Sequence, residues 1–245
     1  MVPSTQRPWR LPWPAWLAIS LLALLSIVST LGGLADVFRA RAETILGQQG
    51  DAIRTSPTRR QAQAALEAYT LARRLDAWRP DLQAAVGDMH ALLAAGRPVW
   101  EAESKAHNRA ARDTYRTAIQ RRPSWPYAWA NLAVVKFQLT ELDREFFTAL
   151  ERSTTLGPWE PEIQKTMAGL GLAAWELLPE ETRTRMRASL ERGLHRQGET
   201  IINLAARYGR LDVLTPLVEG NGRLEAMVQG ERTRAATRQR TKPAP

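Results

Sequence analysis

The stretch Leu156–Gln164, LGPWEPEIQ, decides how the middle of this 245-residue chain is interpreted. A tryptophan stands there between two prolines, in a region where apolar residues otherwise follow a helical period. Gly157 is typical of the left-handed turn that ends a helix, and Pro161 followed by Glu162 is typical of a helix's first turn. We therefore predict an elbow between two helices, with Trp159 buried as a wedge worth on the order of 3–5 kcal/mol of stability.

The elbow belongs to a series of similar junctions. Trp78, Trp125 and Trp159 each stand close to a proline, and the last two are 34 residues apart, the length of a tetratricopeptide repeat. The larger interval from Trp78 to Trp125, 47 residues, has room for an insertion near residues 97–108. The segment Trp129–Ala133, WANLA, resembles the W-x-x-L-G opening of that repeat, with alanine for glycine. The residues predicted to shape the repeat junctions are Trp78, Trp125, Trp129, Pro158, Trp159, Pro161 and Trp175.

After residue 40 the apolar positions follow the period of an α-helix, and each predicted helix has one apolar stripe that must pack on a neighbour. We predict an all-α protein: a single N-terminal transmembrane helix followed, over residues 56–230, by a TPR-like α-solenoid of antiparallel helix pairs. Residues 231–245 lack an apolar face and are expected to form a disordered basic tail. The helices expected after the anchor are 38–53, 58–76, 81–95, 101–121, 127–139, 141–156, 162–178, 180–196, 199–208 and 210–219.

The N-terminal region has the composition of a membrane anchor. No charged residue occurs from Leu11 to Ala35, a run long enough for a helix to cross the hydrocarbon, and tryptophans cluster at its first end. We assign residues 1–13 to a short basic tail, 14–35 to a transmembrane anchor and 36–55 to a juxtamembrane helix or linker. A cleaved signal peptide is the alternative, because Gly33-Leu34-Ala35 is compatible with cleavage, but the apolar run exceeds the usual ~7–15 residues of a signal.

The basic residues before the anchor indicate its orientation. Arg7 and Arg10 lie in the N-terminal tail, and a short basic tail before a single early segment commonly stays in the cytoplasm. The expected location is therefore a bacterial inner membrane, crossed once, with the rest of the chain in the periplasm.

Charge and cysteine content exclude several classes of protein. The net charge is +9, but the N-terminal tail supplies +2 and the last fifteen residues +4, which leaves +3 for residues 11–230. A nucleic-acid-binding protein concentrates basic charge on its folded surface, so no nucleic-acid partner is expected. The chain has no cysteine, which excludes disulfides, thiolate metal sites and cysteine nucleophiles.

No pattern in the sequence predicts an active site. His90, His107 and His195 are isolated, without a partner histidine four residues away, so no metal site is expected. The paired acids Glu180 and Glu181 follow a proline, and acids at a helix's first turn are stabilised by the helix dipole. We predict that the protein is not an enzyme and binds no cofactor.

Trp100 is the candidate contact residue for a partner protein or a glycan. It lies in the predicted insertion rather than at a repeat junction, so repeat packing does not account for it. Indole rings pack on the apolar C–H faces of sugars and are equally common at protein interfaces. For the other tryptophans, we expect that the side chain fills the angle between adjacent repeats.

Two stretches together resemble the VpsP family of bacterial exopolysaccharide biosynthesis proteins. They are Tyr115–Ile119 continuing through Arg122–Ala133, and Leu156–Gln164, and the segments Leu190–Gln197 and Tyr208–Leu211 are compatible with them. The resemblance implies an inner-membrane accessory protein of polysaccharide synthesis or export, and it carries no catalytic residue with it.

Three functions are therefore considered. The first is a membrane-tethered scaffold that binds other envelope proteins of a polysaccharide machine through a concave repeat surface. The second is a glycan-binding envelope protein that uses exposed tryptophans, with polysaccharide as its ligand. The third is an assembly factor for another envelope machine, a pilus or the division apparatus.

Overall fold

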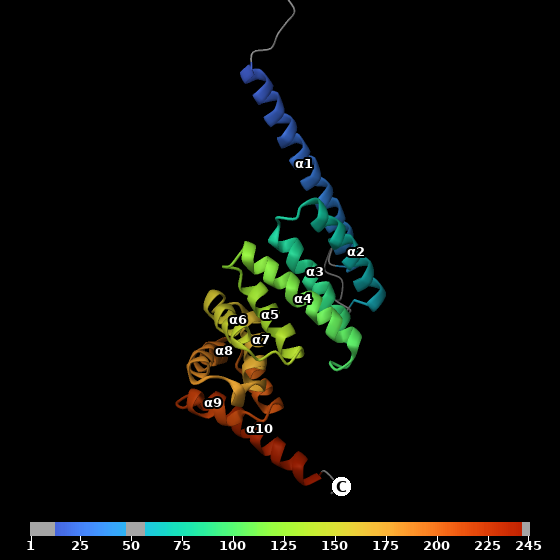
Figure 1. The fold of residues 1–245 in the computed structure, drawn as a ribbon. Coiled ribbons are helices and arrows are strands. Elements are labelled where there is room, and N and C mark those ends of the chain that lie inside the picture. Colours follow the sequence, from blue (N-terminus) through green and yellow to red (C-terminus); the bar gives the residue numbers. More distant parts are fainter. Residues whose placement is uncertain (1–12, 48–56, 242–245) are drawn as a thin grey trace, which may run out of the picture. The chain divides into compact units, whose positions relative to one another are not determined.

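The computed structural model describes residues 13–47 and 57–241, with side chains up to residue 237 (Figure 1). Over these residues the chain forms ten α-helices and one short 3₁₀ helix, and no strand. The prediction of an all-α protein is confirmed. The chain divides into two compact units, Met1–Trp78 and Arg79–Pro245.

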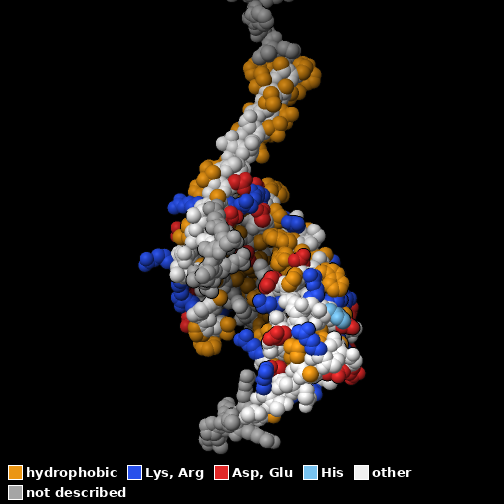
Figure 2. All heavy atoms as spheres, turned by 180° about the vertical axis from the view of Figure 1, so that it is seen from behind, with side chains coloured by type: hydrophobic (Ala, Val, Ile, Leu, Met, Phe, Trp, Pro, Cys, Tyr) orange, Lys and Arg blue, Asp and Glu red, His pale blue; other side chains and the backbone are white. Residues whose placement is uncertain are grey.

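The first unit is built from the long helix α1 (Trp13–Ile45) and the helix α2 (Arg59–Leu75). The most apolar part of α1 has a mean hydropathy of 2.2 and is not buried, and Figure 2 shows its exposed apolar side chains. By length and composition α1 can span a membrane. The separate helix predicted at 38–53 is wrong over 38–45, where α1 simply continues; its residues 48–53 and the tail residues 1–12 lie outside the described parts.

The C-terminal half of α1 packs on α2. Ala35 and Ala42 have no exposed surface, and the small side chain of alanine allows two helices to approach closely. Thr58 and Gln61 form a capping box at the start of α2, each satisfying a backbone N–H of the other. The amide of Gln61 also donates to the carbonyl of Ile45, 3.2 Å away, so the end of α1 and the start of α2 are joined.

The second unit contains α3 to α10. The packing partners along the chain are α3 with α4, α4 with α5, α5 with α6, α6 with α7, α7 with α8, and α8 with α9. Their shared core includes Tyr115, Phe146, Leu172, Ile201 and Leu214, each at most 1% exposed. The bounds are α3 Pro80–Ala94, α4 Ala102–Arg121, α5 Pro126–Gln138, α6 Arg144–Leu156, α7 Pro161–Ala173, the 3₁₀ helix η1 Trp175–Leu177, α8 Glu180–Arg207, α9 Leu211–Val218 and α10 Gly222–Thr241.

The stretch 156–164 forms an elbow, as predicted: α6 ends at Leu156 and α7 begins at Pro161. The role assigned to Gly157 was wrong, because its φ is −125° rather than positive. Glycine is needed there for close approach. A Cβ would lie 3.0 Å from the Cβ of Pro126, so the start of α5 rests directly on this backbone.

The prediction that Trp159 is a buried wedge is also wrong, since 58% of its surface is exposed. Main-chain carbonyls hold the elbow instead. The guanidinium of Arg196 donates to the carbonyl of Trp159 at 2.8 Å, and the amide of Gln197 donates to the carbonyl of Pro161 at 2.9 Å. Gln197 has non-helical dihedral angles (φ −139°, ψ 44°), which kinks α8 where the two side chains meet the elbow. The break expected between the helices 180–196 and 199–208 is confirmed, because α8 consists of two helical segments that join at this kink.

The other tryptophans vary widely in burial. Trp78 is 82% exposed, which contradicts a role in filling a junction. Trp125 and Trp129 are half-buried; Arg122 stacks over the ring of Trp125, and the indole N–H of Trp129 donates to the carbonyl of Pro123 at 2.8 Å. Trp175 is buried at 7% exposure. Trp125 and Trp129 lie at the start of α5, and partial burial does not decide whether they shape a repeat junction. That assignment stays a prediction.

The expectation of a disordered tail from residue 231 differs from the structure, in which α10 runs from Gly222 to Thr241. Three apolar residues on its first turns, Leu224, Met227 and Val228, pack against the core of the second unit, and Val228 is 3% exposed. A helix nucleated by that packing extends at little cost per residue into the alanine- and arginine-containing sequence that follows. Residues 242–245 lie outside the described part of the tail.

Candidate functional site

A surface pocket of about 230 Å³ surrounds Trp100 in the second unit. One wall comes from the α3–α4 loop with Val99 and Trp100, and a second from the exposed side of α4 with Lys105 and Arg109. The third wall is the turn between α5 and α6, formed by Gln138, Leu139, Thr140 and Glu141. The sequence selected Trp100 and no other wall residue, because the rest are brought together only by the tertiary fold.

The loop that carries Trp100 is fixed in place. Arg97 bonds to the carboxylate of Glu101 at 3.0 Å and to that of Glu103 at 2.8 Å. Ser104, which is 1% exposed, donates its hydroxyl to the carbonyl of Ala94 across the loop. The indole nevertheless remains 74% exposed. A large apolar ring held by a rigid loop and left uncovered is typical of a contact surface.

Thr140 gives the pocket an unusual backbone wall. Its φ is +58°, and among the described residues other than glycine no other φ is positive. The turn is a Schellman motif, in which the N–H of Glu141 bonds to the carbonyl of Lys136 and the N–H of Thr140 bonds to that of Phe137. Glycine is usual at this position, and a β-branched residue there is strained by ~1–2 kcal/mol. Strain of this kind is often found next to binding sites.

Glu141 of the pocket wall also belongs to a network of three cations and three carboxylates. Lys136, with no exposed surface, donates from Nζ to Glu145 at 2.7 Å, Asp143 at 2.9 Å and Glu141 at 3.2 Å. Two arginines of α4 bond to the outer carboxylates, Arg112 to Glu141 at 2.5 Å and Arg116 to Glu145 at 2.6 Å. We call these residues the Lys136 cluster. It ties α4 and α5 to the turn before α6.

The cluster shifts the ionisation of its members. Hydrogen bonds from Arg116, opposed by burial and reinforced by Lys136, lower the pKa of Glu145 to about 2. Burial tends to lower the pKa of Lys136, but hydrogen bonds to its three carboxylates outweigh burial and raise it. Each cation of the cluster is held by a carboxylate, and each carboxylate by at least one cation. The cluster supports the fold and the pocket wall and offers no free acid or base for catalysis.

Lys105 and Arg109 behave differently from the cluster. Both are exposed, both line the pocket, and neither side chain has a hydrogen bond or ion pair to any residue within 13–47 and 57–237. Glu141 is the one acidic residue in the pocket wall, and its two oxygens are already occupied by Arg112 and Lys136. The pocket therefore combines an uncovered indole with two cations whose charge the described protein does not neutralise.

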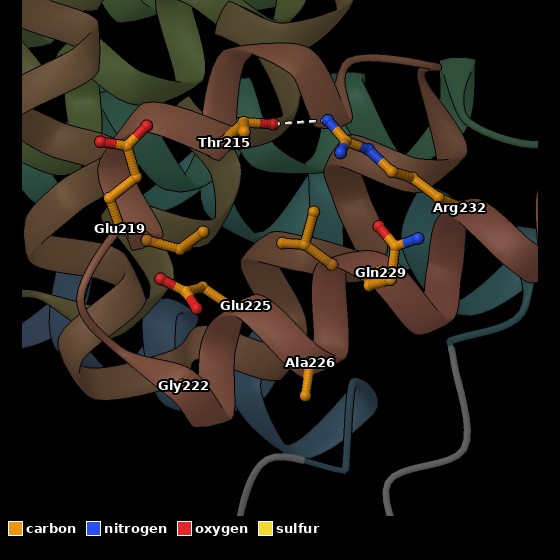
Figure 3. A pocket seen from close by; sticks show the side chains of 9 residues that line it. Thr215, Glu219, Gly222, Glu225, Ala226, Gln229 and Arg232 are labelled. Atoms are coloured by element: carbon orange, nitrogen blue, oxygen red, sulfur yellow. Dashed lines mark hydrogen bonds between the residues drawn. The ribbon is translucent and has the colours of Figure 1, made fainter.

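A larger cavity of about 480 Å³ lies where α9 meets α10, and Figure 3 shows the side chains that line it. Three of its polar side chains are hydrogen-bonded within the protein. Arg232 donates to the hydroxyl of Thr215 at 2.6 Å, as drawn in Figure 3, and the carboxylate of Glu225 accepts from the N–H of Gly220 at 2.7 Å. The first bond attaches α10 to α9, and the second attaches α10 to the turn that precedes it. We assign this cavity to the packing of α10.

Two histidines that the sequence separates are neighbours in the structure. The Nδ1 atoms of His90 on α3 and His107 on α4 are 3.0 Å apart, so one ring donates and the other accepts. Glu103 lies 4.0 Å from the outer nitrogen of His107. Within the described residues no group of three or more histidine, aspartate or glutamate side chains is arranged to hold a metal ion. The pair joins α3 to α4.

Comparison of the sequence with models of protein families and with curated proteins gave no match. The function of the site is therefore inferred from its geometry alone. Of the residues that the sequence selected, Trp100 lies in the pocket, Trp159, Pro158 and Pro161 form the elbow, and Trp125 and Trp129 flank the start of α5.

Proposed function

We propose that this protein is a membrane-anchored helical scaffold or accessory protein of exopolysaccharide synthesis or export, which acts by binding other envelope proteins. The observation that carries the proposal is the combination of an apolar, membrane-length helix with a helical second unit that presents an exposed tryptophan on a rigid loop. The resemblance of Tyr115–Ala133 and Leu156–Gln164 to the VpsP family supplies the polysaccharide context.

Retention of α1 as an anchor is part of this proposal. Ala35, at the end of the sequence compatible with signal cleavage, is fully buried in the unit that α1 forms with α2. Cleavage after Ala35 would remove that buried contact together with the apolar segment, and would leave α2 only residues 36–45 of α1 to pack on. Under this proposal the anchor crosses the inner membrane once and the second unit lies in the periplasm.

The TPR-like solenoid is likewise proposed. Helices two apart along the chain also contact each other, α3 with α5, α5 with α7 and α6 with α8, which is how stacked helix pairs bury a shared core. Hydrogen bonds also join residues at similar separations: Arg112 to Glu141 over 29 residues and Thr182 to Glu151 over 31. Both observations favour a repeating helix-pair unit of about thirty residues.

The proposal is tested by crosslinking in cells followed by purification of the full chain from solubilised membranes. We expect polysaccharide synthesis or export proteins to be captured, and their yield to fall for Trp100→Ala. Trp159→Ala, which removes another exposed indole, is the matched control and should leave capture unchanged. Capture of pilus or division proteins instead would favour the assembly-factor function and contradict the proposal.

A second function, glycan binding, is favoured by one specific observation. Trp100 shares its pocket with the apolar side chains of Val99 and Leu139 and with two exposed cations, Lys105 and Arg109, that form no ion pair within the described residues. Charged residues are depleted at the cores of protein interfaces, so the two cations favour a charged ligand.

A further inference from the structure

We infer that the Trp100 pocket binds an acidic sugar ring, a pyranose carrying a carboxylate. The inference rests on the proposed role in a polysaccharide machine, because that role brings polysaccharide to the pocket. Its physical basis is the pairing of an uncovered indole with two unneutralised cations at the wall of one small cavity.

The cations belong to a single stripe of α4. Lys105, Arg109, Arg112 and Arg116 follow one another at steps of four, three and four residues, which places all four on one face of the helix. The C-terminal two are neutralised by Glu141 and Glu145. The N-terminal two lie beside the pocket and form no ion pair with a carboxylate of the described chain, because Glu141, which lines the same pocket, is held by Arg112 and Lys136. Arg112 and Arg116 each pair with a carboxylate of the protein, and a carboxylate from a ligand would pair with Lys105 and Arg109 in the same way.

The indole selects the rest of the ligand. A pyranose ring has an apolar C–H face that packs on an aromatic ring, while its hydroxyl groups require hydrogen-bonding partners. Gln138 lines the pocket, and its side-chain oxygen is buried and accepts no hydrogen bond within the described residues, so a ligand hydroxyl that reaches this oxygen would satisfy it. An acidic peptide has a carboxylate without a flat apolar face, so it would use the cations but leave Trp100 uncovered.

The size of the pocket limits the ligand further. Its volume of about 230 Å³ is below the ~300–1,000 Å³ of pockets that enclose drug-sized ligands. One sugar ring fits such a space, with the neighbouring rings of a chain extending into solvent. Binding is therefore expected to be weak for a single ring, sensitive to salt and suited to a polymer that offers many identical rings.

The test uses the full-length protein in detergent micelles and ligand-observed NMR titrations. The probes are trimers of galacturonic acid and of mannuronic acid, with maltotriose as the neutral sugar and triglutamate as the acidic peptide. We expect saturable binding of a uronate trimer, and affinities at least about tenfold lower for maltotriose and triglutamate, because each lacks one of the two recognised features.

Variants assign the binding to the pocket. Trp100→Ala and the double substitution Lys105→Gln/Arg109→Gln should each weaken uronate binding by about tenfold or more. The matched controls are Trp159→Ala, which removes another exposed indole (58% exposed, against 74% for Trp100), and Arg144→Gln/Arg152→Gln, which removes two exposed cations of α6 outside the Trp100 pocket. All these positions are exposed, so circular dichroism should show unchanged helicity.

Each outcome decides the inference. If triglutamate bound as tightly as the uronate trimers, the pocket would be a site for acidic protein segments. If the control variants lost as much uronate binding as the pocket variants, the binding would not depend on the pocket. Either result overturns the proposal, as does the absence of binding to both uronate trimers. Capture of envelope proteins without uronate binding would leave the scaffold function standing and remove this inference. Uronate binding without captured envelope proteins would support this inference and contradict the scaffold function.

Discussion

Replacing the buried lysine of the Lys136 cluster, Lys136→Met, tests how the second unit is held together. Methionine keeps most of the volume of the lysine stem, so the change removes the ammonium group while packing is retained. The ammonium group makes three charge-assisted hydrogen bonds, of 2.7, 2.9 and 3.2 Å. Breaking one side of a buried ion pair usually costs ~3–5 kcal/mol, because the other charge is left uncompensated.

The cluster reduces that cost in two ways. Glu141 and Glu145 keep Arg112 and Arg116 as partners, and the side chain of Asp143 is 56% exposed and regains water. We therefore expect Lys136→Met to lower the free energy of unfolding by about 2–3 kcal/mol.

The assay is urea unfolding of the full-length chain in detergent micelles, followed by circular dichroism, with stability taken from the midpoint and slope. Lys165→Met is the matched control, because Lys165 is 51% exposed and lies 3.6 Å from its partner carboxylate. It should change stability by less than ~0.5 kcal/mol. If Lys136→Met were as neutral as this control, the cluster would not stabilise the fold and the reasoning would be refuted.

The same cluster gives stability a defined pH dependence. The pKa of Glu145, ordinarily 4.5, is lowered to about 2 by hydrogen bonds from Arg116 and, after the opposing effect of burial, Lys136. A carboxylate whose pKa is depressed in the folded state stabilises fully above its unfolded pKa and loses that contribution as pH falls through the folded value. The unfolding midpoint of the protein should therefore decline between pH 4.5 and about 2, and the decline should be smaller in Lys136→Met.

Two further comparisons test the packing. Gly87→Ala should destabilise by about 1–3 kcal/mol, because the new Cβ would lie 2.7 Å from the buried ring of Tyr115, whereas Gly230→Ala on α10 meets no atom within 4 Å and should be neutral or stabilising by up to ~1 kcal/mol. Thermal unfolding distinguishes the pair, and equal effects would contradict the close approach of α3 to α4. Trp175→Ala, at a 7% exposed position, should cost about 3–5 kcal/mol, while Trp159→Ala at 58% exposure should cost below ~1. The reverse order would restore the wedge interpretation of the elbow.

The features of the fold that could be predicted from the sequence are those with local causes. Pro80, Pro126 and Pro161 each occupy the first turn of a helix, where a missing N–H costs nothing, so the starts of α3, α5 and α7 were predicted to within one residue. The apolar helix α1 was predicted from the uncharged run 11–35, because length and composition, both local properties of the sequence, are enough to indicate a helix of this kind.

The errors fall where burial is set by tertiary packing. Trp159 has the same sequence surroundings as a wedge residue, but the start of α5 rests on Gly157 and leaves the indole outside. The helix α10 was missed because its few apolar residues, Leu224, Met227 and Val228, cover barely two turns and give no periodic signal. In both cases the deciding partner lies on another helix, and no local pattern records it.

The candidate site shows the same division between local and distant causes. The stripe of four cations on α4 follows from helical spacing alone, but the sequence does not say which of them are neutralised. That depends on Glu141 and Glu145, which reach the stripe from 29 residues further along the chain. Glu141 lies in the turn before α6 and Glu145 in the first turn of α6, and their ion pairs with Arg112 and Arg116 cover only the C-terminal half of the stripe. The unneutralised half then falls beside Trp100, so the fold that builds the Lys136 cluster also leaves the adjacent pocket with its uncompensated positive charge.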